Sequence, residues 1–387
     1  MKVLILHNIY QHAGGEDAMV LSESRMLRKG GHEVHVEYVQ NREIIGVRKK
    51  VDVFIESKFS AARSKWAENL VAEHNADVVH VHNFWPLLTT GVHHGAAKAG
   101  AAVVQTLHNF RLICSNGLLL RDGKICEKCL TSTRAWGVLN RCYRNSLVGS
   151  LAVSRMQAYA LHQNNLVKNV NKFIALTEFG KSRFVAGGLP AEKIVVKANS
   201  ISLPESDSSE DRSGGLYVGR LSQEKGVNVL LEAARRCPEF KITIVGEGPL
   251  RGELEASAPS NVTFTGALPS ESVVSLMRKA RCLIMPSIWY EGFPVTLLEA
   301  YASGLPVVGS DVGALSELIL PGKTGFLFPP GNSDELAKLM RQASKSAAVF
   351  VQMGDAAVIQ YRTRYGQEEN LKTLEKIYDD ALREVNS

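Results

Sequence analysis

Short apolar runs alternate with longer amphipathic segments along the whole chain, and this alternation restricts the fold more than any single motif does. Short apolar runs are typical of buried strands, and the segments that separate them have helical composition. Strands that alternate with helices form parallel sheets with crossover helices, so we predict an α/β protein. The predicted strands are 3–6, 34–36, 78–81, 103–106, 173–176, 216–218, 242–245, 262–265, 282–285 and 307–309, and helices are predicted at 19–28 and 150–161.

The chain is long enough to form two domains. It has 387 residues, of which 45% are hydrophobic, so each of two domains can bury its own core. Segment 202–214 is polar and rich in Ser and Gly, as linkers are. We therefore predict a first domain at 1–201, a linker at 202–214 and a second domain at 215–360.

Two features of the sequence bear on where the protein is located. The chain contains no run of 18 apolar residues, so no membrane-spanning helix is expected. The apolar run 3–6 ends at His7 and Asn8 without a cleavage-like region, and we interpret it as a first strand and not as a signal peptide. We predict a cytoplasmic chain, in which the six cysteines are reduced thiols or metal ligands.

Four of these cysteines fall in a Cys-rich insertion at 112–145. Cys126 and Cys129 form a Cys-x2-Cys pair, flanked by Cys114 and Cys142. Four thiolates are a ligand set for structural zinc. Two interpretations stay open: a structural zinc site without a catalytic role, or a group of buried free thiols.

The charge is distributed unevenly. Residues 1–200 carry 26 Lys and Arg against 15 Asp and Glu, whereas the remainder carries 19 against 24. A basic first half suggests an anionic partner. No helix-turn-helix or stacking-platform pattern stands out, so no nucleic acid is expected, and an anionic membrane surface that carries a lipid-linked acceptor fits better. The alternative is ordinary solvated surface charge.

Two glutamates eight positions apart, Glu291 and Glu299, indicate a ligand site. Glu291 lies in the predicted loop 286–294, and Glu299 lies just over one turn inside the predicted helix 295–303. The N-terminus of a helix after a Gly/Pro loop suits phosphate oxygens. Carboxylates there repel phosphate and are better placed against sugar hydroxyls, which suggests a nucleotide-sugar site. The alternative is an amphipathic helix with one exposed and one capping Glu.

Three ordered motifs carry a resemblance to a known family. The Glu-x7-Glu pattern continues into AYASGLPVV at 300–308, and it is preceded by YVGRLSQEKG at 217–226 and VGEGPL at 245–250. Together they resemble the retaining nucleotide-sugar glycosyltransferases called glycosyl transferases group 1. The resemblance covers roughly the C-terminal half, and the N-terminal half matches more weakly.

The resemblance implies a fold and an activity. The fold is α/β, with two doubly wound Rossmann-like domains facing across a cleft (the GT-B architecture), and the final segment 361–387 crosses back onto the first domain. The activity is transfer of a sugar from a nucleoside diphosphate sugar to a glycan or lipid-linked hydroxyl acceptor. The resemblance further implies retention of configuration and no catalytic cofactor or metal. Bacterial polysaccharide or lipid-linked glycan synthesis, at the inner face of the membrane, is the expected setting.

The resemblance also implies residue roles in the donor site. Arg220 and Lys225 stabilise the departing diphosphate, Glu291 and His108 contact the donor sugar near the reaction centre, and Glu299 binds the ribose. The remaining donor-binding residues are Gly15, Gly219, Gly246, Glu247, Gly248, Leu268, Gly292, Phe293, Pro294, Val295, Thr296 and Leu297. Many family members have Gly where this chain has Pro294, which removes one N–H that could meet phosphate.

On the acceptor side we predict Gly14, Asn83, Trp85 and Asn109. The ring of Trp85 either stacks on an acceptor sugar or packs in the protein, and the sequence leaves both open. His7, His12, His80 and His82 are further strand-end candidates, but no carboxylate at ligand spacing accompanies them, so a metal site there is not favoured.

Three rival functions remain at this point. A sugar-nucleotide epimerase shares the architecture, although Glu-x7-Glu and Gly-Arg-x4-Lys speak against it. A nucleic-acid-binding protein would use the basic, Cys-rich region 98–144. The third rival is a non-catalytic regulatory homologue.

Overall fold

The computed structural model describes residues 1–9, 15–163, 165–203, 209 and 211–386. The chain forms two compact units. The first unit comprises Met1–Leu119, Cys126–Ser200 and Gln367–Ser387, and the second comprises Leu120–Ile125 and Ile201–Gly366.

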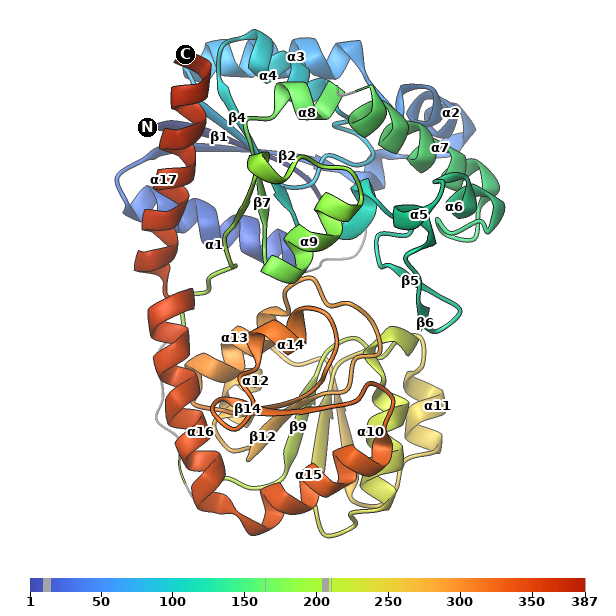
Figure 1. Ribbon diagram of the computed structural model, residues 1–387, viewed down its shortest axis with the longest axis vertical. Helices are drawn as coiled ribbons and strands as arrows, with labels where there is room; N and C mark the ends of the chain where they lie inside the picture. Colours follow the sequence, from blue (N-terminus) through green and yellow to red (C-terminus); the bar gives the residue numbers. More distant parts are fainter. Residues whose placement is uncertain (10–14, 164, 204–208, 210, 387) are drawn as a thin grey trace. The chain divides into compact units, whose positions relative to one another are not determined.

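The first unit is built on a six-stranded parallel sheet in the order β2-β1-β3-β4-β7-β8 (Figure 1). The strands are β1 (Lys2–Ile9), β2 (Glu33–Gln40), β3 (Val78–Val81), β4 (Ala102–Leu107), β7 (Lys172–Ala175) and β8 (Ile194–Val196). Strand β1 pairs with both β2 and β3, so the strand order reverses there. Ligands of doubly wound sheets bind outside the carboxyl strand ends at such a switch point. The loops that follow β1, β3 and β4 are therefore the place to look for a site.

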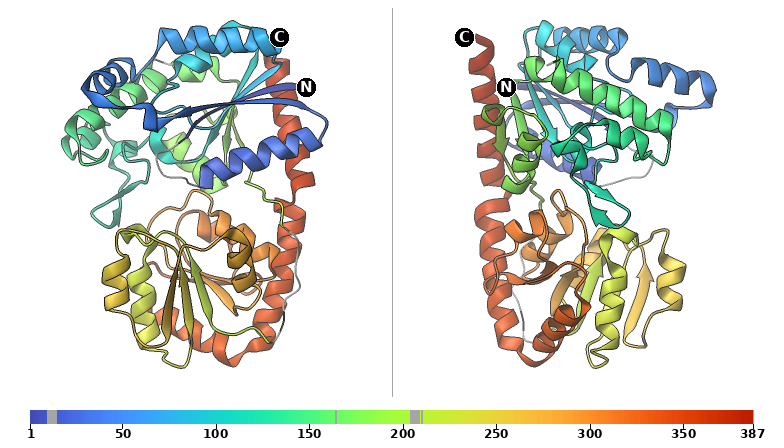
Figure 2. Two further views of the ribbon diagram at one scale, coloured as in Figure 1. Left: turned by 180° about the vertical axis from the view of Figure 1, so that it is seen from behind. Right: turned by 45° about the vertical axis from the view of Figure 1, so that its right-hand side comes forward.

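Helices cover both faces of this sheet (Figure 2). The helices of this unit are α1 (Gly15–Lys29), α2 (Gly46–Glu56), α3 (Ala61–His74), α4 (Gly91–Lys98), α5 (Lys128–Thr131), α6 (Ala135–Leu139), α7 (Leu147–Gln157), α8 (Asn165–Asn169), α9 (Glu178–Ala186) and α17 (Gln367–Asn386). Helix α17 comes from the far end of the chain, yet its Leu374, Ile377 and Tyr378 share a buried cluster with Val3 and Ile5 of β1. The last helix thus completes the core of the first unit.

The second unit repeats this plan with a parallel sheet in the order β11-β10-β9-β12-β13-β14. Its strands are β9 (Gly215–Val218), β10 (Ile242–Val245), β11 (Val262–Gly266), β12 (Cys282–Met285), β13 (Val307–Ser310) and β14 (Gly325–Phe328), and the unit also contains the hairpin β5 (Leu120–Arg121) and β6 (Lys124–Ile125). Its helices are α10 (Val227–Arg235), α11 (Arg251–Ala256), α12 (Ser270–Met277), α13 (Val295–Ala302), α14 (Ala314–Leu318), α15 (Ser333–Lys345) and α16 (Ala347–Gln360). Strand β9 pairs with both β10 and β12, which places the switch point between β9 and β12.

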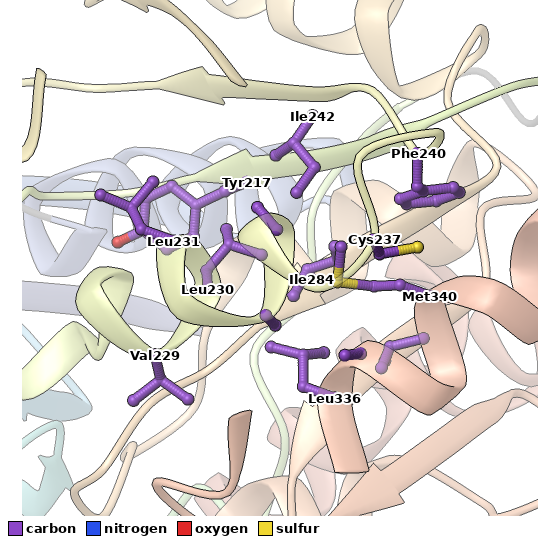
Figure 3. Packing of buried hydrophobic residues seen from close by; sticks show 14 of the residues in the cluster. Tyr217, Val229, Leu230, Leu231, Cys237, Phe240, Ile242, Ile284, Leu336 and Met340 are labelled. Carbon is purple, nitrogen blue, oxygen red and sulfur yellow. The ribbon is translucent and has the colours of Figure 1, made fainter. Parts of the chain in front are cut away.

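Figure 3 shows the core behind that sheet. Leu230 of α10, Ile284 of β12, and Leu336 and Met340 of α15 belong to one cluster of buried side chains. Because these side chains come from the apolar faces of two helices and one strand, their burial holds α10 and α15 against the sheet and fixes the strand ends from which the loops start.

The predicted alternation of strands and helices is confirmed, and the strands predicted at 78–81, 242–245 and 282–285 have those bounds. Strand β2 is longer than predicted. The predicted helix 150–161 is wrong in its bounds, because α7 begins at Leu147 and gives way to a π-helix at Ala158–His162. Two edge strands, β8 and β14, were not predicted. In the described part of the chain, no helix combines the length and apolarity that a membrane span requires.

Candidate active site

The loops that follow β9 and β12 meet at the switch point of the second unit. Loop 219–226 follows β9, and loop 286–294 follows β12. The backbone N–H of Ile288 donates to the carbonyl of Glu224 at 3.0 Å, which joins the two loops directly.

Lys225 and Glu291 form the centre of this site. Lys225 Nζ lies 2.8 Å from Oε1 and 3.0 Å from Oε2 of Glu291. Glu291 is buried, and its Oε1 also accepts a 2.6 Å hydrogen bond from Ser287 Oγ. The Lys225 ammonium lies 5.4 Å from the centroid of the Trp289 ring, within cation–π range. The structure thus brings together two residues that the sequence placed 66 positions apart, and adds Ser287 and Trp289, which the motifs did not single out.

Two glycines permit the close approach of these loops. Gly226 has φ +66°, and a Cβ there would lie 2.0 Å from the carbonyl oxygen of Pro286. Gly246 has φ +143°, and its Cβ would lie 1.9 Å from the carbonyl oxygen of Gly219. Any other residue would meet backbone at both positions, which explains the glycines of GRLSQEKG and VGEGP in structural terms. Gly248 is similarly close to the Leu221 carbonyl.

Helix α13 starts directly after loop 286–294, as predicted. Glu299 is partly buried in it, and burial raises the pKa of its carboxyl group above the ordinary value. The amide of Leu297, a predicted donor-binding residue, donates to the carbonyl of Pro294 at 3.1 Å. The side chains of Leu297 and Phe293 are buried, so these two residues contribute to packing.

The other predicted donor residues surround this centre less tightly. The Arg220 side chain is exposed, and its carbonyl accepts a 2.9 Å hydrogen bond from the Tyr217 hydroxyl. Glu247 is exposed and pairs with Arg251. Pro294 is buried. The other predicted donor residues lie in the loops or at the start of α13 and are partly buried: Gly219, Leu268, Gly292, Val295 and Thr296.

A separate pocket lies at the switch point of the first unit. It is lined by His82, Asn83, Trp85, His108 and Asn109, among others. Four of these five residues were predicted to be site residues, and His82 was not assigned to the site. The pocket therefore gathers residues from the loops after β3 and β4, as expected for a doubly wound sheet.

Trp85 and Asn83 are both buried. The Trp85 indole N–H donates to the Tyr143 hydroxyl at 3.4 Å, and the two rings meet edge to face. Asn83 donates to the Asn8 carbonyl at 2.6 Å. Of the two roles left open for Trp85, packing in the protein is the one that this geometry favours.

Asn109 ties this pocket to helix α1. Its Nδ2 donates to Glu16 Oε1 at 2.9 Å, while its Oδ1 caps the short helix η2 (Phe110–Leu112) through the amide of Arg111. Gly15 is the first residue of α1. Gly14, His12 and part of the predicted linker (204–208 and 210) lie outside the described residues.

Behind the pocket lies a group that sequence reasoning missed. Glu23, from the middle of α1, places Oε1 3.1 Å from both His80 Nδ1 and His82 Nε2. No carboxylate lies at ligand spacing from these histidines in the sequence, but α1 packs against the sheet and supplies one from 57 positions away. Lys197 Nζ lies 3.0 Å from Glu23 Oε2. His7 instead bonds to Asp17 at 2.7 Å.

The four cysteines of the insertion are all reduced, and Cys114 is buried. Burial, together with the neighbouring Cys114, Cys142 and Cys126, raises the pKa of the Cys129 thiol to about 11, so the four lie near one another. Among the described residues, however, the one group with three potential metal ligands within 4.8 Å is Glu23, His80 and His82. The zinc hypothesis for the cysteines stays a prediction.

Two family models match the chain. The model described as Glycosyltransferase Family 4 matches residues 13–203, and the model described as Glycosyl transferases group 1 matches residues 202–358. AmsK of Erwinia amylovora, named an amylovoran biosynthesis glycosyltransferase, is 30% identical over 225 residues, which are 53% of this chain and 55% of AmsK. The chain therefore spans about half the length of this relative.

Solved structures resemble the chain over almost its whole length. HepE of Anabaena, crystallised with UDP, superposes with a TM-score of 0.71 at 18% identity and covers 98% of this chain and 100% of its own. The lipopolysaccharide outer core galactosyltransferase WaaB superposes with a TM-score of 0.60 at 19% identity, over 100% and 98%. These likenesses confirm the predicted fold class, an α/β GT-B protein with two doubly wound domains.

Proposed function

Because the chain belongs to the glycosyl transferases group 1 family, we propose that it transfers a sugar from a nucleoside diphosphate sugar to a hydroxyl acceptor with retention of configuration. The bond between the anomeric carbon and the β-phosphate oxygen breaks, and a bond to the acceptor oxygen forms on the same face. The acceptor proton passes to the leaving phosphate, so the products are a glycoside and a nucleoside diphosphate.

The observation that carries this proposal is the Lys225–Glu291 pair at the switch point of the second unit. A buried carboxylate that accepts from Lys225 and Ser287 holds the ammonium in one place. A fixed cation is suited to stabilise negative charge that develops on a β-phosphate as the glycosidic bond breaks. The exposed Arg220 supplies a second cation from the same loop.

The other residues follow from this placement. Glu299 accepts from the ribose hydroxyls, and Glu291 keeps one face toward the donor sugar. Trp289 Nε1 is buried and has no hydrogen-bond partner among the described residues, so its N–H is available to a donor oxygen. In the first unit, His108 contacts the sugar. With Arg220 and Lys225 as the leaving-group cations, the reaction needs no metal.

The comparisons suggest the class of substrate. HepE was crystallised with UDP-glucose, which supports a nucleotide-sugar donor. AmsK is named for amylovoran biosynthesis, and WaaB for transfer to lipopolysaccharide. We infer that the acceptor here is likewise a growing glycan or a lipid-linked one, in polysaccharide biosynthesis.

Contact with an anionic membrane at its cytoplasmic face belongs to the same proposal. Helix α2 exposes Arg48, Lys49 and Lys50 and also the apolar side chains of Val51 and Ile55. A short helix with both kinds of exposed side chain is typical of interfacial binding to anionic lipid.

A second helix adjoins α2 and adds apolar surface. Arg155 of α7 lies over the Phe54 ring of α2 at 4.9 Å. The first turns of α7 expose Leu147, Val148 and Leu151. We call α2 together with this part of α7 the α2–α7 surface.

Thermal shift and donor hydrolysis with a panel of UDP-, GDP- and dTDP-sugars test the proposed reaction. Stabilisation by one nucleotide series, with slow release of that nucleoside diphosphate, is expected. Absence of both effects for every donor would show that the site does not bind nucleotide sugars.

A further inference from the structure

The first unit contains a buried chain of polar groups that the proposed reaction does not explain. Lys197 Nζ lies 3.0 Å from Glu23 Oε2, and Glu23 Oε1 lies 3.1 Å from His82 Nε2. His82 Nδ1 in turn lies 2.9 Å from His108 Nε2. Lys197, Glu23 and His82 are buried, whereas His108 is partly exposed and lines the pocket.

The charges along this chain decide where each proton sits. Burial would raise the pKa of Glu23, but Lys197 and the two imidazoles outweigh it and hold that pKa well below its usual range. An ionised carboxylate can only accept, so His82 Nε2 carries a hydrogen toward it. Burial, reinforced by His80, lowers the pKa of His82 to about 4, so the ring is neutral near pH 7 and its Nδ1 carries no hydrogen. His82 Nδ1 must therefore accept from His108 Nε2–H.

His108 is then fixed as well. Burial, and next the neighbouring His82, hold the pKa of His108 well below its usual value, so this ring is also neutral. A neutral imidazole with a hydrogen on Nε2 has none on Nδ1. The remaining nitrogen of His108 can accept a hydrogen bond but cannot donate one.

We propose that Glu23 and His82 are positioning residues that hold His108 as its Nε2–H tautomer, so that Nδ1 accepts from a hydroxyl of the substrate. This inference rests on the proposed function only in naming that group a sugar hydroxyl. It specifies the chemistry of the substrate at this point: a hydroxyl binds, whereas a deoxy or O-methyl analogue loses the contact. Loss of one such hydrogen bond lowers kcat/KM by up to about tenfold.

A metal ion is the rival explanation of the same residues. Glu23 Oε1 and His82 Nε2 have no hydrogen-bond partner of regular geometry among the described residues, so their 3.1 Å contact is bent, and His80 Nδ1 completes a three-ligand group. However, Lys197 already neutralises Glu23, and His80 Nδ1 bonds to the Tyr378 hydroxyl at 2.8 Å. A divalent ion would leave an uncompensated double positive charge in a buried place, which is costly. The Lys197–Glu23 pair therefore favours hydrogen bonds that fix the His108 tautomer over a bound metal ion.

Imidazole ¹H–¹⁵N correlation spectra of the full-length protein test the proposal. His108→Gln assigns the His108 signals, and wild-type His108 should have its hydrogen on Nε2. In Glu23→Gln the Lys197 ammonium attracts the amide oxygen, and the amide NH₂ then faces His82 Nε2. His82 Nε2 then becomes an acceptor, and the His82 hydrogen moves to Nδ1 and points at His108 Nε2. The His108 hydrogen should therefore move to Nδ1, and kcat/KM for the sugar donor should fall.

Two further variants separate positioning from mere packing. In Glu23→Gln combined with Lys197→Met, the amide oxygen is released to face His82, and both the Nε2–H tautomer and part of kcat/KM should return. Tyr378→Phe removes the hydroxyl bonded to His80 but no contact of His82 or His108, and should leave the His108 tautomer unchanged.

Three outcomes would overturn the proposal: a hydrogen on Nδ1 of wild-type His108, an unchanged tautomer in folded Glu23→Gln, or one equivalent of tightly bound zinc that Glu23→Gln releases. The wild-type spectrum decides the first even if the variants do not fold. These spectra need no donor, so an inactive protein with the expected tautomer would contradict the proposed sugar transfer and leave this inference standing.

Discussion

Lys225 Nζ lies within hydrogen-bond distance of both carboxylate oxygens of Glu291, at 2.8 Å and 3.0 Å. The resemblance assigns the lysine to the diphosphate and the glutamate to the sugar, and in the structure the two are hydrogen-bonded to each other. Lys225 is partly exposed, with 24% of its side chain accessible, and Glu291 is not. In the proposed reaction the donor phosphate would reach this ammonium, which the Glu291 carboxylate holds in place.

Lys225→Met should lower kcat by a factor on the order of 10²–10³, as loss of a preorganised transition-state contact does. The change in donor Kd should be smaller than the change in kcat, because charge on the β-phosphate grows as the bond breaks. Arg220→Ala should act in the same direction. Calorimetry with the preferred nucleotide sugar and initial-rate kinetics give the two numbers.

Lys338→Met is the matched control, because Lys338 is exposed and pairs only with Glu335 among the described residues. It should leave both numbers unchanged. Activity should also survive EDTA. If EDTA abolishes turnover and Mg²⁺ or Mn²⁺ restores it, the cation pair is not the leaving-group stabiliser.

Glu299→Gln should weaken nucleoside diphosphate binding by about 1–3 kcal/mol, because a hydrogen bond from the ribose to a charged acceptor is lost. Calorimetry across pH adds a second check. Since burial raises the pKa of this carboxyl above 4.5, wild-type affinity should fall as pH drops through the raised value, and the variant should lack that dependence.

Stability should respond in the opposite direction. A carboxyl group whose pKa is raised on folding binds more protons in the native state, so its contribution is present below 4.5 and is lost as pH rises through the raised pKa. The Tm of Glu299→Gln relative to wild type should therefore increase from pH 4 to pH 7. Exposed Glu253→Gln should show no such trend, and an equal trend in both variants would refute the assignment.

Gly226→Ala should destabilise the second unit by about 1–2 kcal/mol from its left-handed backbone alone, and by more because the new Cβ would meet the Pro286 carbonyl. Movement of loop 219–226 should also separate Lys225 from Glu291 and reduce kcat. Chemical denaturation and kinetics measure the two effects.

Gly252→Ala gives a control of opposite sign. Gly252 lies in α11, and a Cβ there would meet nothing within 4 Å. The substitution should stabilise by about 0.5–1 kcal/mol, as Ala does in a helix. Similar losses in both variants would mean that the close approach at Gly226 is not what matters.

Replacing Arg48, Lys49 and Lys50 together by Ser should reduce binding to anionic vesicles, because each cation near the surface contributes about 1 kcal/mol. Salt should release the wild-type protein, since exposed charges are screened beyond about 8 Å at physiological ionic strength. Replacing Val51 and Ile55 together by Ser should weaken the part of vesicle binding that persists in high salt. Liposome co-sedimentation measures the binding of the charge variant, of wild type with and without salt, and of this apolar variant.

The matched control removes three exposed lysines from the second unit: Lys279, Lys323 and Lys338. Binding should persist in this variant. Equal binding of wild type to neutral and anionic vesicles, or none to either, would show that the charge of the α2–α7 surface is ordinary solvation.

The sequence predicted central strands better than edge strands. Strands β3, β10 and β12 are flanked by other strands and are mostly buried, which favours the largely apolar runs from which their bounds were predicted. Strands β8 and β14 end their sheets and are only partly buried. Their sequences, IVV and GFLF, are nevertheless apolar, and a short apolar run by itself does not identify a strand.

The site divides along similar lines. Lys225 and Glu291 come from two motifs, but each follows one of the paired strands β9 and β12, so their proximity follows from parallel topology. Glu23 could not be found in this way, because it occupies an ordinary helical position and meets His82 only when α1 packs over the strand ends. Its other partner, Lys197, is 174 positions away, and no local pattern encodes that distance.

Helix α17 gives the chain an order of completion. Tyr378 is buried against the first sheet and bonds to His80, 298 positions earlier. During synthesis the strands of the first unit emerge from the ribosome long before that helix does. One apolar face of their sheet therefore stays partly uncovered until the whole second unit has been made. The first unit to be translated is thus the last to finish folding. A chain that stops before residue 367 would lack α17, and with it the Tyr378 hydroxyl that bonds to His80.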